Sequence, residues 1–126
     1  MTHRILIVDD DLHIREVIRV ALRKAGMTVF EARDGKEALT RFAGDRPDLI
    51  ILDIGMPEVD GHQVARLLRS EFGAELRIVA ITAYARDEDR QRTRKAGFDA
   101  HVTKPVDIPI LESILSTLKG SSSARA

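Results

Sequence analysis

Cysteine is absent from the 126 residues of the chain, which excludes disulfides, thiolate metal sites and a cysteine nucleophile. Its absence fits a reducing compartment. Tryptophan is absent too, and aromatic residues make up only 4% of the chain, so a core has to be built from aliphatic side chains. The longest apolar runs are far shorter than the ~18–20 residues that span a bilayer, and residues 1–4 show no signal peptide. We therefore expect a cytoplasmic protein without membrane insertion.

An excess of charge of either sign is also lacking, because 20 Lys and Arg balance 20 Asp and Glu. This balance gives no reason to expect a nucleic-acid partner. Hydrophobic residues make up 44% and charged residues 32% of the chain, as is typical of a globular protein. The length suits one domain, which we assign to residues 1–119. Residues 120–126, beginning with Gly120, are expected to form a disordered tail.

Hydrophobic residues alternate between two periods along the chain. Short aliphatic runs predict strands, and they lie at residues 5–8, 28–30, 49–52, 78–81 and 100–102. Segments with helical periodicity alternate with these runs, at residues 14–25, 36–43, 64–68, 87–96 and 110–118. The alternation predicts an α/β fold of the (βα)5 type, a doubly wound five-stranded parallel sheet with helices on both faces. The second and fifth runs are less hydrophobic and are expected at the edges.

Polar residues follow the predicted strands on the side where doubly wound sheets bind ligands. These residues are Asp9, Asp10, Asp53, Thr82 and Lys104. Two carboxylates ~4 Å apart repel by about 4 kcal/mol at an effective dielectric near 20, so we expect a cation between them. Oxygen ligands without His or Cys favour Mg²⁺. Together with a lysine and a hydroxyl, this set suits a phosphoryl group, with a carboxylate as nucleophile.

Four motifs carry these residues: ILIVDDD at 5–11, LIILDIGMPEVDG at 49–61, IVAITAYA at 78–85 and AGFDAHVTKPV at 96–106. Together they resemble the receiver (response-regulator, CheY-like) domains of two-component signal transduction, over nearly the whole chain. The resemblance implies a flavodoxin-like sheet of strand order 2-1-3-4-5. It also implies Mg²⁺-dependent phosphorylation of one aspartate.

Carried over by position, the resemblance implies that Asp53 is the phosphoacceptor. Asp9, Asp10 and Asp53, with the backbone carbonyl of Gly55, would hold Mg²⁺, for which Mn²⁺ can substitute.

The resemblance also implies roles for the last two strand ends. Thr82 would bond the phosphoryl group, with Ala83 small enough to admit it. Lys104 would pair with the phosphoryl oxygens and precede a cis peptide at Pro105.

The sequence departs from the family pattern at residue 101, where receivers usually carry the Tyr or Phe of a rotameric switch three residues before the lysine. His101 either keeps a switch role with Thr82, made pH-sensitive by its protonation, or is an edge-strand histidine without one. Tyr84 either shields the acyl phosphate or is a loop tyrosine packed on the helix expected at residues 87–96. Val106 replaces a frequent Phe, which we interpret as a packing change.

By resemblance, the phosphodonor is a histidine kinase or a histidine phosphotransfer protein. It would meet the start of the first helix and the loop after the fifth strand, where Ile14 and Pro105 are the candidate contacts. Ile14 is either such a contact or a core residue of the helix. The charged segment 87–96 belongs either to an output face for an unidentified downstream protein or to a solvated surface. Its charges would also suit an ion-paired dimer, so we expect a monomer or a phosphorylation-dependent dimer.

We interpret the chain as a phosphoacceptor signalling domain that catalyses only its own phosphorylation and dephosphorylation. One alternative is a Mg²⁺-dependent phosphohydrolase with an aspartate nucleophile, but that class uses an Asp-x-Asp pair and a cap domain. A receiver that takes no phosphate, acting as a binding module, and a flavodoxin-like nucleotide binder are further alternatives. The complete acidic and basic set disfavours the former, and three aspartates after the first strand disfavour the latter. The sequence leaves open a stand-alone receiver or one belonging to a hybrid kinase.

Overall fold

The computed structural model describes residues 4–55, 61–72, 76–83 and 97–125, and within these ranges it contains one parallel sheet. Its strands are β1 Arg4–Val8, β2 Thr28–Ala32, β3 Leu49–Asp53, β4 Arg77–Thr82 and β5 Ala100–Thr103. Neighbouring strands pair in the order β2-β1-β3-β4-β5, and every pairing is parallel. The fold class and the strand order expected from the sequence are both confirmed.

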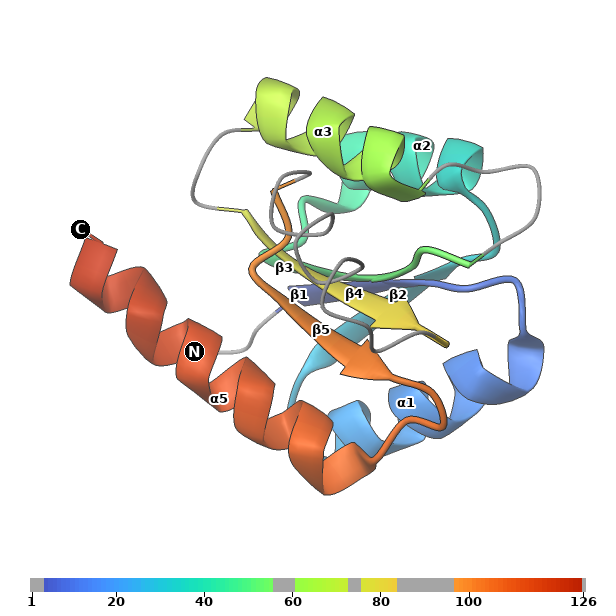
Figure 1. Ribbon diagram of the computed structural model, residues 1–126, viewed down its shortest axis with the longest axis vertical. Coiled ribbons are helices and arrows are strands. Elements are labelled where there is room, and N and C mark those ends of the chain that lie inside the picture. The colour runs from blue at the N-terminus through green and yellow to red at the C-terminus, as the bar shows by residue number, and fades with distance from the viewer. Residues whose placement is uncertain (1–3, 56–60, 73–75, 84–96, 126) are drawn as a thin grey trace.

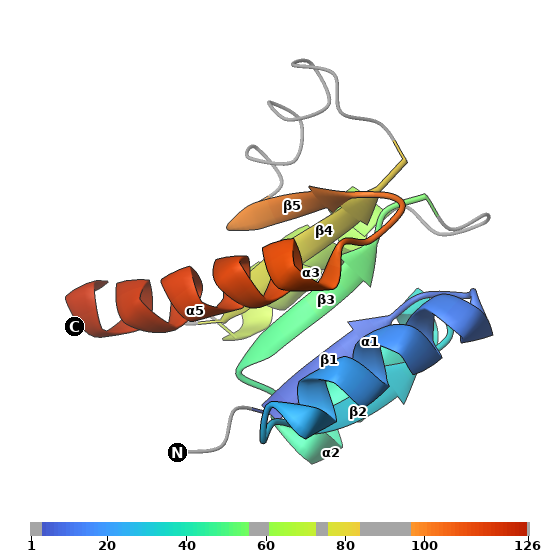
Figure 2. The same cartoon turned by 90° about the horizontal axis from the view of Figure 1, so that it is seen from below.

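Helices cover both faces of this sheet (Figure 1). They are α1 Leu12–Lys24, α2 Gly35–Asp45, α3 Gly61–Phe72 and α5 Ile108–Arg125. The pair α1 and α5 lies on one face and the pair α2 and α3 on the other, and Figure 2 shows the first pair crossing the sheet side by side. The helix expected at residues 87–96 lies outside the described residues. No helix in the described ranges is long and apolar enough to cross a membrane.

The two faces of the sheet divide the core by the alternation of side chains along each strand. Toward α2 and α3 point residues such as Leu6 and Ile50, and toward α1 and α5 point their neighbours Ile7 and Ile51. Because both faces are covered, β1, β3 and β4 read as continuous aliphatic runs. The edge strands β2 and β5 are only partly buried, which agrees with their weaker hydrophobicity.

Helix α1 has well-defined ends. The Asp11 carboxylate accepts hydrogen bonds from the backbone N–H groups of His13 (2.9 Å) and Ile14 (3.3 Å), which caps the first turn. The chain leaves the helix through Gly26, whose φ of +88° lies in the left-handed region that glycine adopts without strain. The Asp11 cap at the other end starts α1 immediately after the acidic residues that follow β1.

The last helix is longer than expected. We predicted a disordered tail over residues 120–126, whereas α5 continues through this segment to Arg125. Glycine and serine cost a helix at most about 1 kcal/mol per residue relative to alanine, and no proline follows to stop it. A helix that is already formed can therefore run on past Gly120. The assignment of the folded domain to residues 1–119 stays a prediction.

Candidate functional site

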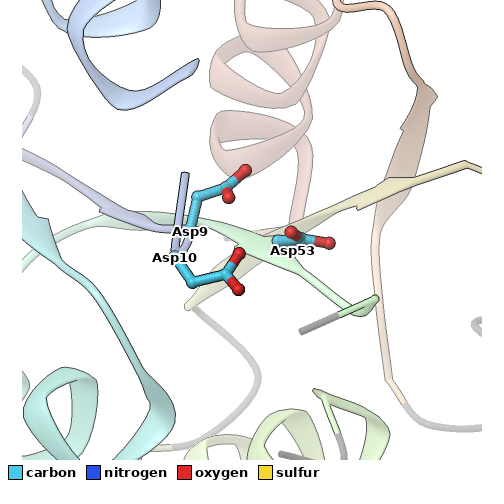
Figure 3. Close-up of side chains that lie close together, drawn as sticks. All are labelled: Asp9, Asp10 and Asp53. Carbon is cyan, nitrogen blue, oxygen red and sulfur yellow. The ribbon is translucent and has the colours of Figure 1, made fainter. Parts of the chain in front are cut away.

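Three carboxylates gather at the carboxyl edge of the sheet (Figure 3). We call Asp9, Asp10 and Asp53 the acidic trio. One oxygen from each side chain lies within 4.8 Å of the others. The strand register explains this convergence, because Val8 at the end of β1 is paired with Leu52, so that Asp9 and Asp53 follow at the same level. The prediction that these residues come together is confirmed by the geometry of the structure.

The Asp9 side chain is fully buried, and its two carboxylate oxygens differ in their hydrogen bonding. Its Oδ1 accepts a hydrogen bond from the Asp11 backbone N–H (2.9 Å), whereas Oδ2 has no hydrogen-bond partner among the described residues. Lys104 Nζ lies 3.7 Å from Oδ2. Burial, aided by the charge of Asp53, raises the pKa of Asp9 from 3.8 to about 6, although the Asp11 N–H and Lys104 act in the opposite direction. The ionised side chain therefore lacks compensation that a bound cation can supply.

Asp53 ends β3 and is almost fully buried. Its Oδ1 accepts a hydrogen bond from the Gly55 backbone N–H (2.8 Å), and its Oδ2 accepts one from Lys104 Nζ (3.0 Å). A Cβ atom at Gly55 would lie 3.3 Å from Oδ1, so a side chain there would crowd this carboxylate. Glycine at this position avoids that crowding. Asp10, the third member of the trio, is exposed to solvent.

Lys104 follows β5 and brings its ammonium group between Asp53 and Asp9. Its backbone N–H donates to the carbonyl of Thr82 (2.8 Å), and its peptide bond to Pro105 is cis, as the resemblance implied. Burial lowers the pKa of Lys104, but the hydrogen bond and the charge of Asp53 outweigh it, so the pKa is raised overall. Lys104 is therefore a fixed positive charge beside the trio.

The other predicted site residues lie around this centre. Thr82 is buried at the end of β4, next to the strand that carries Asp53, and exposed Ala83 follows it. His101 is partly exposed and pairs with Ala80 on β4. Thr82 lies two residues after Ala80 on the same strand, so Thr82 and His101 point to the same face of the sheet. Tyr84 lies outside the described residues.

The two candidate partner contacts differ in exposure. Ile14, in the first turn of α1, is partly buried and packs against the core on the α1 and α5 face. Pro105 is exposed, as is the side chain of Leu12 at the start of α1 (56%). Ile14 therefore serves the core and still has surface available for contact.

Sequence reasoning missed Arg15. Its side chain donates a hydrogen bond to the backbone carbonyl of Asp9 (2.6 Å) and forms an ion pair with Glu31 on β2 (3.3 Å). The sequence signal for this contact is weak: an arginine one turn into a helix that follows three aspartates.

The acidic trio fits a hard divalent cation. All of its donors are oxygens, they lie close enough to share one ion, and one of them, Asp9 Oδ2, is buried without a hydrogen-bond partner in the described part of the chain. The all-oxygen donor set suits Mg²⁺, a hard cation that prefers oxygen ligands and keeps several of its waters.

Comparison with known proteins gives concordant results. The sequence profile of the response regulator receiver domain matches residues 5–116. A 14.6 kDa protein encoded in the sodA1 3′ region of Leptolyngbya boryana is 42% identical over 104 residues, which are 82% of this chain and 79% of that protein. Response regulator MprA of Mycobacterium ulcerans is 43% identical over 119 residues, 94% of this chain and 50% of the relative. The chain thus spans about half the length of the MprA regulators that it matches.

Solved structures agree with these sequence relatives. The chemotaxis response regulator CheY4 of Vibrio cholerae superposes with a TM-score of 0.85 at 29% identity, covering 94% of this chain and 99% of that one.

Proposed function

The chain belongs to the response regulator receiver domain family, and from this premise we propose that it is a phosphoacceptor of a two-component phosphorelay. In this proposal Asp53 accepts a phosphoryl group from a phosphohistidine on a histidine kinase or a histidine phosphotransfer protein. The observation that carries the proposal is the Asp53 carboxylate, which is buried at a strand end with an ammonium group at 3.0 Å and two further carboxylates beside it.

The transfer is a substitution at phosphorus. A carboxylate oxygen of Asp53 attacks the phosphorus atom, the P–N bond to the donor imidazole breaks, and the bonding electron pair leaves with the imidazole nitrogen, which takes up a proton. Lys104 Nζ, which donates a hydrogen bond to Asp53 Oδ2, would instead contact the negatively charged phosphoryl oxygens after the transfer. The Thr82 hydroxyl would donate a hydrogen bond to another of these oxygens.

Charge explains why the reaction would need a divalent cation. With all groups ionised, three carboxylates face one ammonium group, so two negative charges are uncompensated before the phosphoryl group arrives. Asp9, Asp10, Asp53 and the Gly55 carbonyl would hold Mg²⁺, which would neutralise the incoming phosphoryl oxygens. We further propose that the chain catalyses no other turnover, in contrast to a phosphohydrolase.

The acceptor residue can be identified chemically. Phosphoramidate contains the P–N bond of a phosphohistidine, and hydroxylamine converts an acyl phosphate to a hydroxamate on the same residue. After both reagents with Mg²⁺, peptide mapping should find the hydroxamate at Asp53. A hydroxamate at Asp9 or Asp10 instead would contradict the assignment and favour the phosphohydrolase alternative, whose nucleophile lies after the first strand.

Hydrolysis of the acyl phosphate would return the domain to its resting state. Glycine at residue 55 places no side chain against Asp53 Oδ1, so nothing from this residue would orient or block an attacking water. We propose that Tyr84 shields the phosphoryl group, which predicts a shorter phosphoryl lifetime in Tyr84→Ala than in Tyr84→Phe. Equal lifetimes in these two variants and the wild type would remove this role.

The switch proposal joins Thr82 to His101. Both lie on one face of neighbouring strands, so a movement of the Thr82 side chain toward the phosphoryl group would vacate space on the side of His101. Protonation of His101 would make partner binding by the phosphorylated chain pH-dependent. If His101→Ala left partner binding by the phosphorylated chain the same as in the wild type at every pH from 6 to 8, the switch role would be contradicted.

We propose that the donor docks over the start of α1 and the loop after β5, through Ile14 and Pro105. The support is the exposed apolar surface there, which continues along α1 into a groove against α5 lined by Val17 and Val20. Ile14→Ala should slow transfer from a protein donor but leave phosphorylation by acetyl phosphate unchanged. Ile110→Ala is the matched control, because Ile110 is exposed at 54% on α5. Equal slowing with both donors would contradict a docking role.

A further inference from the structure

Arg15 connects the acidic end of β1 to the neighbouring strand β2. Its Nη1 donates to the backbone carbonyl of Asp9 (2.6 Å), and its Nε lies 3.3 Å from Glu31 Oε1. The side chain is only 14% exposed. One guanidinium group therefore spans the backbone of the metal-binding loop and a carboxylate on a different strand, which its rigid fork of donors allows.

The other end of this connection is itself held firmly. Glu31 Oε2 accepts a second charged hydrogen bond from Arg19 Nη1 (2.8 Å). Partial burial raises the pKa of Glu31, but the two arginines outweigh it and lower the pKa overall. Glu31 therefore stays ionised and gives Arg15 a fixed partner, on a strand whose register with β1 pairs Glu31 with Ile7.

The carbonyl that Arg15 binds belongs to the peptide group between Asp9 and Asp10. On the other side of Asp9, its N–H donates to the carbonyl of Ala32 (3.1 Å), so the Asp9 backbone is held from both sides. Asp10 is exposed, and its carboxylate has little packing of its own to hold it. The orientation of the preceding peptide group sets the direction in which the Asp10 side chain leaves the backbone, and so its approach to Asp9 and Asp53.

We propose that Arg15 is a positioning residue for the metal site, acting through the Asp9 carbonyl, with Glu31 as its anchor. This inference rests on the proposed function, since it requires that the acidic trio binds Mg²⁺. Arg15 touches no phosphoryl group in this account. It sets the spacing of the carboxylates before the cation arrives, as outer partners of metal ligands generally do.

The loss of Arg15 would change the Mg²⁺ affinity in opposite directions, depending on whether its charge or its positioning of the Asp9 backbone matters more. Removing a positive charge near three carboxylates strengthens their attraction for Mg²⁺ if only long-range electrostatics matter. Losing the bond to the Asp9 carbonyl weakens Mg²⁺ binding if positioning matters. Arg19 is the matched control, because it pairs with the same glutamate while the structure gives it no bond to the Asp9 carbonyl.

The experiment measures the Mg²⁺ dissociation constant by calorimetry for the wild type, Arg15→Met and Arg19→Met, at a temperature where all three are folded. Loss of an outer partner of a metal ligand typically costs 10–100-fold in affinity, so we expect about tenfold weaker binding in Arg15→Met. Arg19→Met should stay within about twofold of the wild type, because both bonds of Arg15 remain. Arg15→Lys keeps the charge but not the fork, and should also bind more weakly.

The remaining outcomes overturn the proposal. Unchanged or tighter Mg²⁺ binding in Arg15→Met, or equal weakening in Arg15→Met and Arg19→Met, would refute positioning through the Asp9 carbonyl and leave the proposed function intact. If Arg15→Met does not fold, Arg15→Lys decides by the same criterion. A wild-type chain that binds no Mg²⁺ would instead overturn the proposed function itself, and this inference with it.

Discussion

Replacing Asp9 by asparagine should make the metal-free protein more stable. Asp9 is buried, and its Oδ2 has no hydrogen-bond partner among the described residues, so its ionised form is held at a cost in the folded state. Asparagine has nearly the same shape, removes the charge and keeps an oxygen to accept the Asp11 N–H. The variant thus isolates the cost of charge burial at the centre of the proposed site.

The magnitude follows from the pKa of Asp9, which burial raises from 3.8 to about 6. Between these values the folded state binds more protons than the unfolded state, so this group makes stability fall as the pH rises, and the cost is complete above the folded pKa. The pKa change corresponds to about 3 kcal/mol at pH 7.5 and about 1 kcal/mol at pH 4.5. Asp9→Asn should recover these amounts.

Thermal unfolding followed by circular dichroism, with a chelator present, would measure this effect. At pH 7.5 the midpoint of Asp9→Asn should lie roughly 10 °C above that of the wild type, and the gap should shrink at pH 4.5. Asp10→Asn is the matched control, because exposed Asp10 should change stability by less than about 1 kcal/mol. Added Mg²⁺ should close the gap by stabilising the wild type. Equal stabilities at pH 7.5, or a gap that is the same at both pH values, would refute the reasoning.

Three further substitutions test other parts of the structure. Lys104→Met removes the ammonium group beside the acidic trio, so it should tighten Mg²⁺ binding severalfold and slow phosphorylation by acetyl phosphate. Weaker Mg²⁺ binding in this variant would show that the lysine does not oppose the cation. Arg69→Met breaks a largely buried ion pair with Asp99 (2.9 Å), so it should lower the free energy of unfolding by about 3 kcal/mol in a urea titration. A loss below about 1 kcal/mol would mean that the pair contributes little. Gly61→Ala puts a Cβ 2.8 Å from the Cα of Ile54 and should cost about 1–3 kcal/mol in thermal unfolding, and a neutral effect would show that the start of α3 can shift.

The arrangement of strands could be predicted because the sequence pattern and the core agree. Residues 5–8, 49–52 and 78–81 are apolar throughout, and the structure buries them on both faces of the sheet. The position of the site followed from topology, since Asp9, Asp53 and Lys104 each stand where a parallel strand ends. The strand order came from the resemblance to receivers, because periodicity alone does not distinguish the possible orders.

Other features depend on contacts between distant segments. Asp9 and Asp10 are identical neighbours, yet one is fully buried and the other exposed, because the backbone turns one side chain inward at the end of β1. The contact between Arg15 and Glu31 joins residues from a helix and a strand, and only the packing of α1 beside β2 brings them together. The extension of α5 past Gly120 was missed because glycine and serine weaken a helix without ending it.

The central claim is that Asp53 accepts a phosphoryl group in a Mg²⁺-dependent reaction. The most direct measurement is the intact mass of the chain after incubation with acetyl phosphate, with Mg²⁺ or with a chelator, for the wild type and Asp53→Asn. The account predicts that only the wild type with Mg²⁺ gains the mass of one phosphoryl group. A gain of the same size in Asp53→Asn, or in the wild type with the chelator, would contradict it.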